Sequence, residues 1–171
     1  MIAFKNVILL FLILSSCSNG SMKENDIDGF ISKFNNENFN NLKGISIFQR
    51  SKGVNEIVYA VGRYGENKPL YFVEFNTSQK RIKNISRSLL IQNSIPDYLT
   101  DNEITNAVNE IRKYDFYLLS VDSSENVFIN PYRPNEPAYY LRLSENISDS
   151  IVRKGYVFNH YKDNWYINDK N

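Results

Sequence analysis

Few side chains in this chain could do chemistry on their own. The chain has one histidine, His160, and one cysteine, Cys17. A histidine can act as a general base or a metal ligand because its pKa lies near neutrality. His160 lies in a segment of alternating aromatic residues, 156–161, where a packed or half-exposed position on a strand is the expected state. A zinc site based on cysteine or histidine is excluded, since one histidine and one cysteine cannot supply the usual ligands.

Other catalytic patterns are missing from the sequence as well. There is no G-x-S-x-G motif and no glycine-rich phosphate loop. Paired carboxylates of the glycosidase kind converge only in three dimensions, so the sequence leaves them open. Glu56, Glu74 and Glu145 lie at the ends or edges of expected strands, where we expect them to be solvated. We therefore predict no catalytic residue, no metal and no cofactor, and a binding module in place of an enzyme.

The N-terminal residues have the pattern of an export signal. Lys5 precedes an uninterrupted apolar run at 7–14, and Ser15 and Ser16 end that run. A membrane span needs about 20 apolar residues, so this run is too short to cross a bilayer. A charged start, a short apolar stretch and small residues are typical of a secretory signal peptide. A buried helix of the domain is the alternative, and the lack of an amphipathic pattern disfavours it.

The residues that end this signal, Leu14-Ser15-Ser16-Cys17, resemble the lipobox of bacterial lipoproteins. The resemblance implies that a diacylglyceryl group is attached to the sulfur of Cys17, that cleavage falls between Ser16 and Cys17, and that the freed amine is acylated. A thiolate is the strong nucleophile that such an attachment needs. An exported chain with one cysteine forms no internal disulfide, which agrees with a modified Cys17. Acyl chains would hold the protein on a membrane without a transmembrane helix.

This resemblance sets the expected organisation and partners. Residues 1–16 are the cleaved signal peptide, 17–24 a flexible tether and 25–171 a single globular domain. Ser18 stands where an Asp would resemble an inner-membrane retention signal, which favours the outer membrane of the cell envelope. Removing residues 1–16 takes away Lys5 and no acid, so the formal net charge falls from +1 to 0. Nucleic acid is thus not an expected partner. The expected partners are the membrane, lipoprotein-processing enzymes and an unidentified protein or small ligand.

Hydrophobic periodicity predicts the elements that must position any site. Residues 25–38 carry apolar side chains at helical spacing, and Thr100 with Glu103 forms a capping box for a second amphipathic helix through Lys113. Strands are predicted at 44–50, 56–63, 69–76, 115–122, 126–130, 138–144, 155–161 and 164–168, with a tight turn at Asp163-Asn164 and an ambiguous segment at 79–93. The fold class is α+β, a largely antiparallel sheet with two amphipathic helices and a possible loose tandem α-β-β-β-β order.

The candidate recognition surface is the aromatic C-terminal segment. Tyr161, Trp165 and Tyr166 could supply rigid contact area with a polar tip. Trp165 and Tyr166 should point to opposite faces of a strand, so at least one belongs to the core. Two further functions stay open: an immunity-type lipoprotein that neutralises an envelope-directed toxin, and a carboxylate-dependent envelope hydrolase. A basic run at Lys80, Arg81, Lys83 and Arg87 could meet anionic head groups, although a polar strand face explains it more simply.

Overall fold

The computed structural model describes residues 26–145, 150–153 and 155–168. The expected signal peptide and Cys17 lie outside the described residues. The helices are α1 (Ile27–Phe34), α2 (Ser88–Gln92), α3 (Asp101–Tyr114) and a 3-10 turn, η1 (Asn40–Leu42). The strands are β1 (Ile45–Lys52), β2 (Glu56–Arg63), β3 (Tyr71–Asn76), β4 (Arg81–Ser86), β5 (Leu118–Val121), β6 (Val127–Asn130), β7 (Tyr140–Arg142), β8 (Ile151–Arg153), β9 (Tyr156–Lys162) and β10 (Trp165–Asn168).

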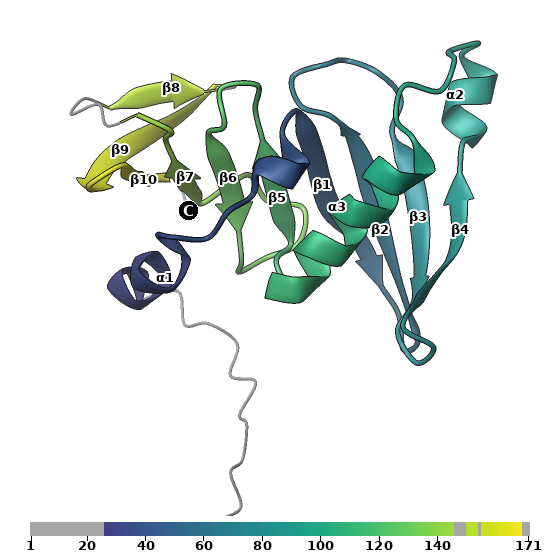
Figure 1. Cartoon of the computed structure of the whole chain (residues 1–171), viewed down its shortest axis with the longest axis horizontal. Coiled ribbons are helices and arrows are strands. Elements are labelled where there is room, and N and C mark those ends of the chain that lie inside the picture. The colour runs from purple at the N-terminus through teal and green to yellow at the C-terminus, as the bar shows by residue number, and fades with distance from the viewer. Residues whose placement is uncertain (1–25, 146–149, 154, 169–171) are drawn as a thin grey trace, which may run out of the picture.

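All ten described strands join one sheet, in the order β4-β3-β2-β1-β5-β6-β7-β10-β9-β8 (Figure 1). Each neighbouring pair is antiparallel, which confirms a largely antiparallel sheet with helices. Four strands follow α1, but α2 and α3 come before the remaining six, so the second half departs from the predicted tandem α-β-β-β-β order. None of the described helices is long and apolar enough to cross a membrane.

Helix α3 begins and caps as the sequence predicts. The Thr100 hydroxyl accepts a hydrogen bond from the Glu103 amide at 3.2 Å, and the Glu103 carboxylate accepts one from the Thr100 amide at 2.8 Å. The helix ends at Asp115, which has a left-handed backbone (φ 55°). Its buried side chains are Ile104, Ala107, Val108 and Ile111, and they pack on one face of the sheet.

Helix α1 is shorter than the predicted 25–38 because a side chain from the sheet forms hydrogen bonds with the carbonyl oxygens at its end. Asp26 caps its start, accepting a hydrogen bond from Gly29 at 3.0 Å. At its end, one guanidinium nitrogen of Arg142 donates to the carbonyl oxygens of Phe34 (2.8 Å) and Asn35 (3.1 Å). These carbonyls would otherwise bond to a further helical turn, so Arg142 stabilises the early stop.

The sheet buries side chains on both of its faces. The helix-side core lies under α1 and α3 and runs from β3 to β10; its members include Phe30, Leu42, Ile47, Val61, Tyr71, Ile104 and Trp165. The far-side core lies on the opposite face and consists of Phe128, Ala138, Leu141, Leu143, Ile151, Phe158 and Tyr166. Consecutive residues of β6 and β10 alternate between the two cores, as the two-residue period of a strand requires.

Candidate functional site

The three predicted recognition residues lie in different environments. Trp165 is fully buried in the helix-side core, where its indole nitrogen donates to the Asn35 side chain at 2.9 Å. Tyr166 is fully buried in the far-side core, and its hydroxyl has no hydrogen-bond partner among the described residues. Tyr161 is 42% exposed, and its hydroxyl lies 3.4 Å from a carboxylate oxygen of Asp28. Only Tyr161 is therefore available at the surface.

His160 is an exposed residue of β9 and does not line any of the three cavities described below. Its Nε2 atom lies 2.8 Å from the carbonyl oxygen of Asp163, so the ring closes the turn before β10. The ring also meets Tyr166 edge-on at 5.2 Å. These contacts give His160 a local structural role.

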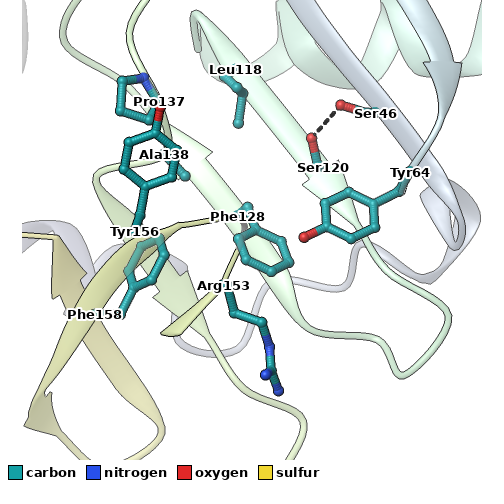
Figure 2. A pocket seen from close by; sticks show the side chains of 10 residues that line it. All are labelled: Ser46, Tyr64, Leu118, Ser120, Phe128, Pro137, Ala138, Arg153, Tyr156 and Phe158. Carbon is teal, nitrogen blue, oxygen red and sulfur yellow. Dashed lines mark hydrogen bonds between the residues drawn. The ribbon is translucent and has the colours of Figure 1, made fainter. Parts of the chain in front are cut away.

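The structure forms a pocket on the far side that the sequence did not reveal (Figure 2). Its volume is about 160 Å³. The lining residues come from strands and loops that are far apart in the chain: Ser46, Tyr64, Leu118, Ser120, Phe128, Pro137, Ala138, Arg153, Tyr156 and Phe158. We call this cavity the far-side pocket.

Aromatic rings form the walls of the far-side pocket. Tyr64 stacks on Phe128 with ring centroids 5.0 Å apart, and Phe128 meets Phe158 edge-on at 6.2 Å. Phe128 lies on β6 and Phe158 on β9, with β7 and β10 between them in the sheet. Three strand spacings in a flat sheet would span about 14 Å. The sheet must therefore curl, so that β9 folds back over β6 and encloses the pocket.

The polar groups at the far-side pocket are few, and most lie on one side of it. Ser46 and Ser120 are cross-strand partners, and their hydroxyl oxygens lie 2.6 Å apart. Figure 2 shows this pair and Tyr64 on one side of Phe128, with Ala138 and Tyr156 on the other. Burial, reinforced by the Asp122 carboxylate, raises the pKa of Tyr64 to about 12, so its hydroxyl stays protonated at neutral pH. The exposed guanidinium of Arg153 adds a positive charge at the border.

Carboxylates gather in a second place, a charged cleft at the start of α3. The cleft measures about 500 Å³ and includes Arg63, Arg87 and Glu103 among its lining residues. Glu103 accepts a bond from Arg63 at 2.8 Å, and Arg87 forms ion pairs with Asp97 at 3.1 Å and with Asp101. Hydrogen bonding from the Thr100 backbone lowers the pKa of Glu103. A general acid needs a raised pKa, so Glu103 has the opposite property.

The remaining carboxylates singled out in the sequence are also ion-pair partners or exposed. Glu56 and Glu74 lie on either side of Lys83, at 3.4 and 3.5 Å from its amine. Glu145 is exposed and borders a cavity beside Asn126. Across the described ranges, no three His, Cys, Asp or Glu side chains come together in a group that could hold a metal ion.

Most of the far-side pocket could not be found from the sequence. Ser46 and Ser120 are distant in the chain, and nothing local indicates that β1 and β5 are neighbours. Tyr156 and Phe158 do fall in the aromatic segment that the sequence indicated, and strand alternation places them on one face. No family model, no curated protein and no solved structure matches this chain, so its function must be argued from the geometry of the far-side pocket.

Proposed function

We propose that this protein is a lipid-anchored lipoprotein of the bacterial cell envelope whose domain binds a partner through the far-side pocket. The observation that carries the proposal is an apolar, aromatic-walled cavity that stays open to solvent beside two hydroxyl groups and one arginine. Concave apolar sites with a few polar groups are the usual form of a binding site.

The size of the pocket limits what it can hold. Sites for whole drug-sized ligands measure about 300–1,000 Å³, whereas an apolar cavity of about 150 Å³ takes one benzene-sized molecule. At about 160 Å³, the far-side pocket accepts a single ring or branched aliphatic group. We infer that this group is one part of a larger partner, either a side chain of a protein or a ring of a small ligand. A buried anchor of this kind can dominate the affinity of an interface.

The protein is proposed as a binding module in place of an enzyme, and its charges support this choice. The carboxylates of the charged cleft are paired with Arg63 and Arg87, and the lowered pKa of Glu103 makes it a poor proton donor. A carboxylate-dependent hydrolase needs one acid with a raised pKa beside a second carboxylate.

Aromatic fragments test the far-side pocket. Indole and benzyl alcohol are titrated into the full chain in detergent, and binding is followed by saturation-transfer NMR. Ala138→Leu adds volume inside the pocket and should abolish fragment binding, whereas Ala138→Ser, which adds almost none, should retain it. Melting temperatures verify that both variants are folded. Equal fragment binding by the Leu and Ser variants, or none by the unmodified chain, would overturn the proposal.

The anchor is tested separately with a radiolabelled fatty acid. Cys17→Ala should give an unprocessed or soluble protein without label, whereas Ser18→Ala should keep the label because it leaves the thiol in place. Label that persists in Cys17→Ala would show that this thiol is not the acylated group. A stoichiometric protein partner recovered with the anchored chain would then favour the immunity-type function over a small-ligand receptor.

A further inference from the structure

The structure divides the basic run of the sequence into two pairs with different surroundings. Lys83 is held between Glu56 and Glu74, and Arg87 pairs with Asp97 and Asp101. The other two members, Lys80 in the β3–β4 turn and Arg81 at the start of β4, form no ion pair with another described residue. The Arg81 side chain donates a hydrogen bond to the neutral side chain of Gln79, at 2.9 Å.

The β1–β2 turn brings further basic residues to the same end of the sheet. Arg50 and Lys52 lie at the end of β1, are exposed, and likewise form no ion pair within the described part of the chain. A hydrogen bond of 3.0 Å from the Thr77 amide to the Asn55 carbonyl joins the two turns directly. Figure 1 shows both turns together at the lower right, at the opposite end of the strands from α2. We name the set Arg50, Lys52, Val54, Lys80 and Arg81 the basic tip.

Charge at this end is concentrated, although the chain as a whole is nearly neutral. At this end of the sheet, five cations, the four of the basic tip and Lys83, outnumber the two carboxylates Glu56 and Glu74 by three. Both carboxylates are already bound to Lys83. The four cations of the basic tip are thus open to an external anion.

Val54 gives the basic tip an apolar point. It is 96% exposed, the highest value among the large hydrophobic side chains of the described residues. Turns favour Gly, Asn, Asp, Ser and Pro, so turn geometry does not account for a valine there. An exposed apolar side chain at the same end of a sheet as several Lys and Arg residues can enter the interface of an anionic bilayer, where the cations meet head groups and the apolar group meets acyl chains.

We propose that the basic tip docks the domain onto an anionic lipid surface, with Val54 entering the interface and the four cations contacting head-group phosphates. A nucleic acid is the weaker alternative, because the basic tip has no aromatic side chain for base stacking and a phosphate backbone gains nothing from Val54. In Figure 1 the start of α1, where the chain enters the domain, lies toward the same lower side as the basic tip.

Quenching of a tryptophan by brominated lipids measures this docking. Val54→Trp reports from the basic tip, and Ile91→Trp is the matched control, since Ile91 is 76% exposed at the α2 end of the sheet. The native Trp165 is fully buried and contributes a constant background. Each variant, as the full chain, is reconstituted into vesicles of one-third anionic lipid or of zwitterionic lipid alone. Vesicle-bound chains are isolated by flotation, and their tryptophan fluorescence is compared with and without brominated lipid.

Quenching should appear for Val54→Trp in anionic vesicles only, and high salt should abolish it. Adding Lys52→Gln and Lys80→Gln should lower the ratio of docked to undocked domains about 25-fold, at about fivefold per charge. Lys43→Gln and Lys68→Gln, which remove two lysines paired elsewhere, should leave the ratio unchanged. Equal quenching of both tryptophan positions, or equal quenching in zwitterionic vesicles, would overturn the proposal. If duplex DNA, added at an equal phosphate concentration, prevents the quenching of Val54→Trp by anionic vesicles, the lipid proposal would also be overturned, in favour of a general site for polyanions.

Discussion

The two faces of the sheet are built in different ways. On the helix side, α1 and α3 cover the strands, and aromatic rings interlock around Phe30, which stacks on Tyr140 at 4.0 Å and meets Trp165 edge-on at 6.0 Å. On the far side, none of the described helices contributes to the core, and the ribbon of β8 and β9 folds back over β6. The helix-side core is thus covered by helices, whereas the far-side core is covered by strands of the same curved sheet.

This difference indicates how stability and recognition are divided. A face closed by packed helices leaves little room for another molecule, because side chains fill the interior at crystal-like density. Where a curved strand pair folds back over a sheet, the side chains between them can leave an unfilled space. Here that space is the far-side pocket. We expect substitutions on the helix side to act on folding and those around the pocket to act on binding.

Trp165→Ala should have the largest effect on stability. It removes a fully buried ring from the helix-side core and leaves the Asn35 side chain without its donor. Large-to-small changes of this kind cost about 3–5 kcal/mol in the free energy of unfolding. Urea denaturation followed by circular dichroism measures the loss. A loss below about 1 kcal/mol would show that the helix-side core does not carry the fold.

Tyr64→Ala should cost less stability, although it also removes a stacked aromatic ring. Tyr64 is only half-buried, so about 1–2 kcal/mol is expected. Fragment binding, in contrast, should be lost, because the ring forms one wall of the far-side pocket. The same two measurements, denaturation and NMR titration, check both halves of this prediction. If Tyr64→Ala destabilises the protein as much as Trp165→Ala does, the division between the two faces is wrong.

Thr100→Ala should give a smaller effect that is confined to the helix side. It removes the hydroxyl that caps α3, and the loss of an N-cap costs about 1 kcal/mol. Thr105→Ala, in the middle of the same helix, is the matched control and should be neutral or slightly stabilising because Ala has the higher helix propensity. Fragment binding at the far-side pocket should be unchanged in both variants. A change in fragment binding in Thr100→Ala would show that the two faces of the sheet are energetically coupled.

The smallest expected effect is a change in acid sensitivity. Hydrogen bonding from Thr100 holds the pKa of Glu103 below its ordinary value of 4.5 in the folded protein. Its ionised form therefore contributes stability above that value, and the contribution is lost as the pH falls through the folded pKa. Glu103→Gln should lower stability at neutral pH and flatten its decline below pH about 4.5. Denaturation curves at several acidic pH values measure the slope, and an unchanged slope would contradict the argument.

Local signals predicted the elements that depend on local chemistry. The capping box of α3, the strands near 44–50, 56–63 and 69–76, and the turn at Asp163-Asn164 all agree with the structure. The end of α1 was not predictable, because it depends on Arg142, a residue more than 100 positions away. Strand β8 was also missed, since a strand of three residues in a polar segment gives no clear periodicity.

The candidate site was less predictable than the fold. Alternation along β10 correctly separates Trp165 from Tyr166, but it cannot tell that both faces of the sheet are buried. The aromatic segment contributes two walls of the pocket, Tyr156 and Phe158, which were not among the predicted recognition residues. Curvature of the sheet creates the pocket, and curvature follows from the packing of the whole chain.

The position of β10 has a consequence for the order in which the molecule can assemble. β8 and β9 precede β10 in the chain, yet β10 lies between β9 and β7 in the sheet. When residues emerge one after another, the β8–β9 hairpin can form early but has nothing to dock on until β10 has paired with β7. β10 therefore connects the two cores, since Trp165 completes the helix-side core and the pairing of β10 with β9 holds the pocket wall in place.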